Sequence, residues 1–558
     1  MDAPSRRLVL PVLAAALAFA VCGPLLGRGF VLSYDMVFAP RQYFVPDAFG
    51  IGGTLPRSVP ADAAVALATT VLPGDIVQKL VLLLAVFFAA LGAGRLVPTE
   101  HLGTRLVAAT AYAWTPYFAE RLFIGHWPLL LAYASLPWIA GAGLAARDHA
   151  PRSLPKLVIA CAAAVLTPPG GVLAAAVMVV AAGSRRLWQT VPLAIVLNLP
   201  WLVPTFLNAG GTFSDPAGVT AFSARAESWG PALLSVLGLG GIWNAETVPE
   251  SRAVPLVPVL TLVVVAVAVA GLWPLASRWG TAPVRSLTAL GVLGVFLASL
   301  ATLPGGAALL TAATRYVPGA GLLRDAQKWV AWWALPLALG FALAVEAAAA
   351  KLKSGRVALV TAAVVFPLLT MPDLAWGGWG RLGTARYPAD WQAVSEKLGD
   401  RPGDVLVLPL SAFRGFAWNG GRTQLDPAPR VLPKPVLMDD TLQVGGERVA
   451  GEDPRVGDVR AATSARELTD AGIGWILVEH GTPGYVDPQW LAGATRVWSG
   501  DWLTLYRTPG EPPVKEISWT PALLANGVAL ALLCVAVLCR MLPMRTLGRG
   551  RILPPRKE

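Results

Sequence analysis

A polar stretch, SYDMVFAPRQYFVPD at residues 33–47, directly follows the first hydrophobic segment of the chain. It carries an acid, Asp35, and a cation, Arg41, where the chain would otherwise only be leaving a membrane. Charge close to apolar segments is costly, so it usually faces a cavity or a partner. A carboxylate in such a place can serve as a general base when a hydroxyl lies within hydrogen-bond reach. The alternatives are a solvated loop carboxylate, or an Asp–Arg pair that only fixes the loop.

A second polar cluster, RDAQKW at residues 324–329, stands just before a late apolar segment. On a helix, Arg324 and Lys328 are four residues apart and share a face. A guanidinium binds phosphate oxygens through two donors and an ammonium acts as a point charge, so the pair suits a lipid-linked phosphate. The alternative is anchoring by long cationic side chains that reach the headgroups. This anchoring interpretation is weaker at the outer end of a span, because the positive-inside rule disfavours positive charge there.

Two more clusters combine charge with aromatic side chains, YFAERLFIGHW at residues 117–127 and SARAESWGP at residues 223–231. The first is expected to form a tight outer turn, in which Glu120 and Arg121 can neutralise one another. Its His126 can instead cap a helix. Trp229 fits the interfacial aromatic belt better than stacking on a sugar. The candidate substrate contacts from all these clusters are Glu120, His126, Arg225, Glu227, Trp229 and Asp325.

Several common catalytic and cofactor motifs are absent from the sequence. It contains no GxxxxGK[ST] phosphate loop, no HExxH, no CxxC and no GxSxG elbow. The four histidines are scattered along the chain, which disfavours a histidine metal cluster. We therefore expect no metal, no cofactor and no ATP-driven pump.

The composition is that of an integral membrane protein. Of 558 residues, 55% are hydrophobic and 14% are charged, whereas soluble domains carry roughly 25% charged residues. The net charge of +11 could suggest nucleic acid. The charges gather at the ends of apolar runs instead, as orientation signals do, so we expect no nucleic-acid partner. The four cysteines lie in or beside apolar segments, so no disulfides are expected.

Hydropathy and length predict about twelve transmembrane helices, including a short pair joined by LTPPGG at residues 166–171. If the N-terminus is cytoplasmic, every inner loop and the C-terminal tail are basic, as the positive-inside rule requires. Both termini are then cytoplasmic, and residues 33–47 lie outside the plasma membrane. The expected spans are Leu8–Leu26, Val77–Leu96, Leu106–Ala119, Leu122–Ala145, Leu157–Thr167, Gly171–Ala182, Trp188–Leu207, Pro255–Leu275, Ser286–Leu303, Trp329–Ala350, Val357–Met371 and Pro521–Leu542.

The outer segment Pro372–Ser518 is long enough to form a domain of its own. Its helical and strand-like patterns alternate, which predicts a small α/β domain. The chain thus divides into a transmembrane catalytic region (1–371), an outer domain (372–518) and a last span with a basic tail (519–558). The expected elements of the outer domain are helices at Tyr387–Leu398 and Ala465–Ile473, strands at Asp404–Leu410 and Trp475–His480, and a hairpin at Thr495–Thr508.

This combination resembles the GT-C superfamily of glycosyltransferases, and within it the actinobacterial arabinofuranosyl- and mannosyltransferases. The resemblance covers most of the chain and is carried by SYDMVFAPRQ, the paired spans around LTPPGG, RDAQKW before a late span, and the external domain. Such enzymes use polyprenyl-phosphate sugars on the outer side of the membrane and keep an acidic catalytic residue in the first outer loop. The matching position here is Asp35. One departure is that no second acid stands beside Asp35, since the next one is Asp47.

The resemblance implies an inverting enzyme that moves a sugar, arabinofuranose or mannose, from a polyprenyl-phosphate donor to a cell-wall glycan or glycolipid acceptor. Asp35 would deprotonate the acceptor hydroxyl. Arg324 and Lys328, with Arg41, would hold the donor phosphate and stabilise the charge that develops on it.

Two other functions are compatible with the sequence. Twelve spans with both termini inside also suit a transporter or flippase of a lipid-linked saccharide, although few charges stand inside the spans, Glu346 being one. A scaffold for envelope assembly, with the outer domain as its docking module, is the third hypothesis.

Overall fold

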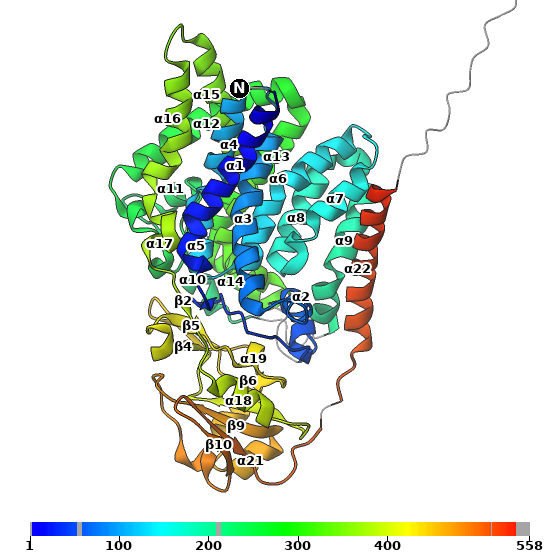
Figure 1. Cartoon of the computed structure of the whole chain (residues 1–558), viewed down its shortest axis with the longest axis vertical. Helices are drawn as coiled ribbons and strands as arrows, with labels where there is room; N and C mark the ends of the chain where they lie inside the picture. Colours follow the sequence, from blue (N-terminus) through cyan, green and yellow to red (C-terminus); the bar gives the residue numbers. More distant parts are fainter. Residues whose placement is uncertain (1–2, 53–57, 208–213, 515, 543–558) are drawn as a thin grey trace, which may run out of the picture.

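The computed structural model describes residues 3–52, 58–207, 214–514 and 516–542. It is a bundle of mostly long helices with a small α/β unit at one end (Figure 1). Apolar runs become helices because a helix satisfies its own backbone polar groups, which the interior of a membrane requires. The predicted basic tail lies outside the described residues.

Within the described part of the chain, eight helices are long and apolar enough to cross a membrane. The number is nine if the bent pair Arg356–Thr370 and Pro372–Trp379 is one span. The remaining predicted spans correspond to shorter helices, including the expected pair on either side of Thr167. The helices outside the α/β unit are α1 (Ala3–Cys22), α2 (Ala61–Ala68), α3 (Gly74–Leu96), α4 (Leu102–Ala113), α5 (Pro116–Phe123), α6 (Trp127–Arg147), α7 (Ser153–Cys161), α8 (Pro168–Ala182), α9 (Leu187–Leu207), α10 (Ala217–Ala221), α11 (Ala232–Leu237), α12 (Val257–Trp279), α13 (Thr281–Ser299), α14 (Gly306–Tyr316), α15 (Ala331–Lys351), α16 (Arg356–Thr370), α17 (Ala375–Trp379) and α22 (Thr520–Met541).

The predicted span Leu106–Ala119 is broken between α4 and α5. Thr115 caps α5 by accepting a hydrogen bond from the N–H of Phe118 at 3.2 Å, and Pro116 occupies the first helical position, where its missing N–H is harmless. The outer turn expected around Glu120 and Arg121 is therefore a helix instead. The two side chains are fully buried.

The α/β unit contains the predicted elements. Its five-stranded sheet has the order β10-β11-β9-β3-β6, in which β3 is parallel to both of its neighbours and β11 is antiparallel to both of its own. The expected helices, strands and hairpin are present as α18, α21, β3, β9 and β10–β11. The bounds in this unit are β2 (Thr384–Ala385), α18 (Asp390–Lys397), β3 (Asp404–Leu408), β4 (Phe413–Gly415), β5 (Thr423–Leu425), α19 (Ala428–Val431), β6 (Val436–Leu437), β7 (Leu442–Val444), β8 (Glu447–Val449), α20 (Arg455–Ala461), α21 (Ala465–Asp470), β9 (Ile473–Glu479), β10 (Thr495–Ser499) and β11 (Leu503–Arg507).

The first loop is hydrogen-bonded to this α/β unit. A short strand β1 (Phe30–Val31) pairs with β2 in antiparallel fashion. Beyond it, the backbone N–H of Tyr34 donates to the carbonyl of Thr423 at 2.8 Å, and the N–H of Leu425 donates to the carbonyl of Tyr34 at 2.8 Å. The segment that carries Asp35 is therefore held between the helix bundle and the α/β unit.

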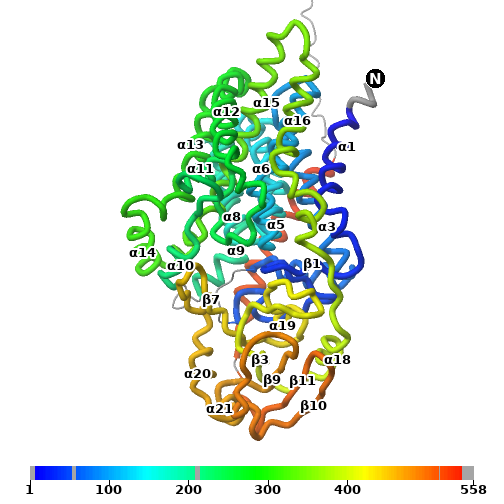
Figure 2. Tube along the Cα trace, turned by 90° about the vertical axis from the view of Figure 1, so that its left-hand side faces the viewer, coloured from blue at the N-terminus to red at the C-terminus, as the bar shows by residue number. Residues whose placement is uncertain are grey.

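The hairpin β7–β8 makes a second connection, because it packs on α10 (Figure 2). The backbone N–H of Ala450 donates to Asp215 at 2.7 Å, and Arg324 donates to Glu452 at 2.9 Å. The first loop and this hairpin thus each connect the α/β unit to the bundle.

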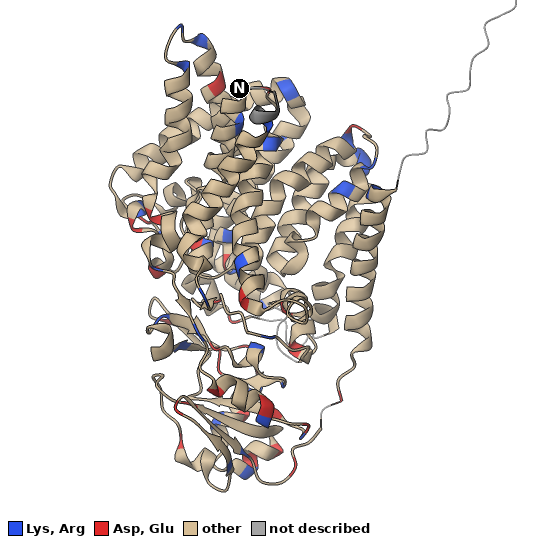
Figure 3. Ribbon diagram, viewed as in Figure 1, with Lys and Arg blue, Asp and Glu red and all other residues tan. Residues whose placement is uncertain are grey.

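Basic residues gather at the end of the bundle that lies away from the α/β unit (Figure 3). The connection between α15 and α16 there carries Lys351, Lys353 and Arg356. This is the asymmetry on which the predicted orientation depends.

Helices α12 and α15 pack with their backbones in direct contact. A Cβ atom at Gly271 would lie 1.7 Å from the carbonyl oxygen of Gly340, and one at Gly340 would lie 2.2 Å from the carbonyl oxygen of Ala268. Small residues permit such close approach between membrane helices.

Replacing Gly271 by alanine should therefore force the two helices apart and destabilise the protein by at least about 1–3 kcal/mol. Thermal unfolding in nanodiscs measures the effect. Gly527→Ala on α22 is the matched control, because its Cβ would meet nothing within 4 Å. Equal stability changes in the two variants would contradict the close packing.

Candidate active site

Asp35 lies in a tight turn whose ends pair with each other. The N–H of Met36 donates to the carbonyl of Ser33 at 2.8 Å, and the N–H of Asp35 donates to the carbonyl of Ile124 at 3.1 Å, which ties the turn to the end of α5. The side chain of Asp35 is 41% exposed. It is thus a fixed carboxylate that solvent or a substrate can reach.

His126 connects Asp35 to the interior. Its Nε2 lies 2.8 Å from Oδ2 of Asp35, and its Nδ1 lies 2.9 Å from Nη1 of Arg121. The aspartate comes from the first loop, the histidine precedes α6, and the arginine lies on α5. The turn and the broken helix together place these three side chains in a row.

Arg121 is the centre of the cluster and is fully buried. Its Nη1 and Nη2 donate to the two carboxylate oxygens of Asp325 at 2.7 and 3.1 Å, and Nη2 also donates to Gln327. Burial alone would raise the pKa of Asp325, but the Arg121 guanidinium beside it outweighs burial and holds the pKa far below its usual range. The result is a bidentate ion pair of the strong kind.

The network continues from Gln327 to a pair of buried carboxyl groups. The amide of Gln327 donates to Glu120 at 3.1 Å and to the carbonyl of Gly240 at 3.2 Å. Burial is the main reason that the pKa of Glu120 lies well above its ordinary value, and the neighbouring carboxyl of Glu227 raises it further. Glu227 is in turn paired with Arg252 at 2.7 Å. The Glu227 carboxyl acts in this direction because two neighbouring carboxyl groups resist being ionised together.

The two cations of RDAQKW, Arg324 and Lys328, lie in different surroundings. The expected helical face does not form, because two 3₁₀ turns, Ala320–Leu323 and Ala326–Val330, are separated at Asp325. Arg324 pairs with Glu452 of the α/β unit. Lys328 is buried, with its ammonium 5.5 Å from the ring centre of Trp329, and no acceptor for that ammonium appears among the described residues.

Three predicted residues lie on the surface. Arg41 is exposed and lies over the ring of Tyr43 at 5.7 Å, with no ion pair to Asp35 in the described structure. Arg225 is exposed as well. Trp229 is 53% exposed and donates to the carbonyl of Pro255 at 2.6 Å, as expected of an interfacial tryptophan.

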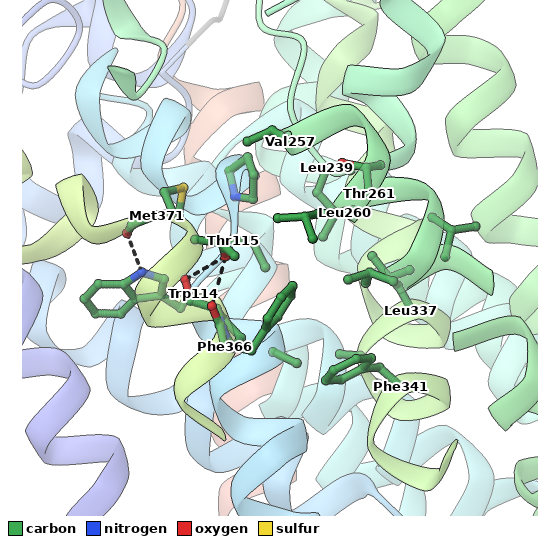
Figure 4. Close-up of a pocket in the computed structure, with 18 of the residues that line it drawn as sticks. Trp114, Thr115, Leu239, Val257, Leu260, Thr261, Leu337, Phe341, Phe366 and Met371 are labelled. Atoms are coloured by element: carbon green, nitrogen blue, oxygen red, sulfur yellow. Dashed lines mark hydrogen bonds between the residues drawn. The ribbon is translucent and has the colours of Figure 1, made fainter. Parts of the chain in front are cut away.

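An apolar slot of about 780 Å³, counting its open mouth, is lined by residues of α4, α11, α12, α15 and α16 (Figure 4). Leu260, Phe341, Phe366 and Trp114 are typical of its lining. Arg252 is the charged residue among those that line it, so the slot borders the network described above.

The sequence does not reveal the two residues that organise this network. It suggests Arg121 only as a charge that neutralises Glu120, and it does not point to Gln327. The available signal was an arginine and a glutamate inside an otherwise apolar helix, since such charges are rarely buried without specific partners. Among the described residues, no group of three or more His, Cys, Asp or Glu side chains is arranged to hold a metal ion.

The comparisons with known proteins identify a fold. No family model and no curated protein matches the sequence. Among solved structures, the chain is similar in fold to a glycosyltransferase. That protein is the arabinofuranosyltransferase AftD from Mycobacteria: the TM-score is 0.55 at 18% identity, over 92% of this chain and 40% of that one. A mutant form of AftD gives a TM-score of 0.52 at 16% identity, over 92% of this chain and 42% of that one. The chain therefore spans about two fifths of the length of AftD.

Asp47, the next acid after Asp35, faces the α/β unit and has no hydrogen bond to the network among the described residues. Burial raises the pKa of Asp47 to about 6, and the nearby Arg455 only partly opposes this. Because its pKa in the unfolded chain is roughly 3.9, the folded protein binds more protons than the unfolded chain between these values.

Stability should therefore fall as the pH rises from about 4 to 6. Asp47→Asn should make this slope shallower and stabilise the protein at pH 7 by about 1–3 kcal/mol. Thermal unfolding across this pH range tests the prediction, with the exposed Asp501→Asn as control. An unchanged slope in the Asp47 variant would show that another group is responsible.

Proposed function

We propose that this chain is a membrane glycosyltransferase of cell-wall synthesis. It moves arabinofuranose or mannose, with inversion, from a polyprenyl-phosphate donor to an extracytoplasmic glycan or glycolipid acceptor. The observation that carries the proposal is the partly exposed Asp35, which His126 and Arg121 link to the RDAQKW segment, in a chain whose fold is similar to that of AftD.

Asp35 acts as the general base in the proposed reaction. The acceptor hydroxyl attacks the anomeric carbon, a new C–O bond forms, and the bond from that carbon to the phosphate oxygen breaks. The hydroxyl proton passes to Asp35, and polyprenyl phosphate leaves with the bonding electron pair. General bases of this kind contribute typically 10²- to 10⁴-fold in rate.

Lys328 is the cation best suited to the leaving phosphate. It is buried beside the ion pair of Arg121 and Asp325, without an acceptor of its own among the described residues. A fixed positive charge in a water-poor site stabilises negative charge that develops in the transition state. Arg324 is held by Glu452, so its role is first to connect the α/β unit to the bundle. Arg41 is proposed only as an accessory contact.

The apolar slot offers a surface for the polyprenyl chain, because hydrocarbon binds best where both walls are apolar. The basic end of the bundle favours a topology with about twelve crossings and both termini in the cytoplasm. The α/β unit, residues 372–518, would then lie outside the plasma membrane and guide the acceptor to Asp35.

Asp35→Asn should abolish transfer while leaving the protein folded, because asparagine keeps the size but not the basicity of aspartate. The rate should fall by about 10²- to 10⁴-fold. The assay uses a radiolabelled polyprenyl-phospho-arabinofuranose donor and a synthetic arabinan oligosaccharide, with Asp501→Asn as control. Near-normal turnover would exclude Asp35 as the base, and movement of the labelled lipid across the bilayer without a new glycosidic bond would favour the transporter hypothesis.

Lys328→Gln should reduce the rate by about 10²- to 10³-fold, the usual loss for one group that stabilises a transition-state anion. Arg324→Gln and Glu452→Gln should each have smaller effects that resemble one another. Initial rates over a range of donor concentrations measure all three. A loss in Arg324→Gln as large as that in Lys328→Gln, with Glu452→Gln fully active, would transfer the phosphate role to Arg324.

A further inference from the structure

The position of His126 between Asp35 and Arg121 determines where its proton lies. The charged groups that face the imidazole are Asp35 from the first loop, Arg121 from α5, and Asp325 from the segment before α15. Each can be assigned as a hydrogen-bond donor or acceptor from its chemistry alone.

Arg121 can only donate, because a guanidinium has N–H groups and no lone pair available in proteins. Its orientation is fixed by the bidentate pair with Asp325, at 2.7 and 3.1 Å, and by the further bond to Gln327. The Nη1 group that lies 2.9 Å from His126 therefore presents a hydrogen to Nδ1. Nδ1 must accept that hydrogen with its lone pair, so it carries no proton of its own.

We propose that Arg121 is a positioning residue that fixes His126 as a neutral imidazole with its proton on Nε2, so that His126 donates to Asp35 Oδ2 and orients the base. The inference rests on the proposed role of Asp35. It adds that His126 takes no proton during the reaction, because its one lone pair is already engaged by Arg121. The acceptor proton therefore stays on Asp35, whose Oδ1 has no hydrogen-bond partner among the described residues.

The tautomer can be measured without any assay of activity. The full chain, labelled with ¹⁵N-histidine, is reconstituted in nanodiscs at pH 7, and its ¹⁵N spectrum is compared with that of His126→Gln, which lacks the His126 signals. We expect an unprotonated, pyridine-like Nδ1 and a protonated, pyrrole-like Nε2. An imidazolium with both nitrogens protonated, or a proton on Nδ1, would overturn the inference while leaving the role of Asp35 intact.

The second test compares two replacements of His126 in the transfer assay. Glutamine offers one acceptor for Arg121 and one donor for Asp35, whereas leucine offers neither. We expect His126→Gln to transfer the sugar at least ten-fold faster than His126→Leu. The loss in the leucine variant should appear in kcat rather than in KM. The pH profile of the glutamine variant should have the same shape as that of the wild type.

The activities of the His126 and Asp35 variants together show whether the role of His126 or the role of Asp35 is wrong. If folded His126→Gln is as inactive as His126→Leu, and Asp35→Asn is also inactive, His126 itself carries the proton and the inference fails alone. If Asp35→Asn is fully active, the proposed role of Asp35 as the base fails and the inference fails with it, although the transferase function stands. Thermal unfolding of each variant confirms that it is folded.

Discussion

The buried ion pair between Arg121 and Asp325 is the interaction on which the candidate site depends. It joins α5 to the segment before α15, about two hundred residues further along the chain. A buried guanidinium is stable only when its donors are matched, and removing one partner from such a pair costs about 3–5 kcal/mol. Because Arg121 also binds His126 and Gln327, the same pair orients the groups on either side of it. The site thus contains one connected hydrogen-bond network of Asp35, His126, Arg121, Asp325 and Gln327.

The second constraint is the position of the first loop, which lies between the helix bundle and the α/β unit. The backbone of the turn that carries Asp35 is hydrogen-bonded to Ile124 of the bundle. Through Tyr34 it is also hydrogen-bonded to Thr423 and Leu425 of the α/β unit. The α/β unit therefore does more than cover the site, because its hairpin β4–β5 forms part of the frame that holds the proposed base. A rigid frame of this kind favours catalysis, since a base must be held within hydrogen-bond reach of its substrate.

Sequence patterns point to the polar clusters but not to the partners of each side chain. The patterns point to Asp35, His126 and Asp325, and in the structure all three belong to one network. Arg324 and Lys328 were expected to share a helical face. That expectation was wrong because the chain changes direction at Asp325, whose side chain is engaged by Arg121. The local sequence could not show this, since the residue that redirects the segment comes from another helix.

The sequence by itself determined the membrane class, most of the long helices, and the helices and strands of the α/β unit. These features follow from the length and periodicity of apolar runs, which are local properties of a chain. Only the tertiary structure decided which charges meet. Arg121 is buried and binds several partners, Arg324 contacts the α/β unit, and Lys328 lies beside the ion pair of Arg121 and Asp325. The physical reason is that a buried charge is stabilised by partners distant in sequence, and packing alone selects them.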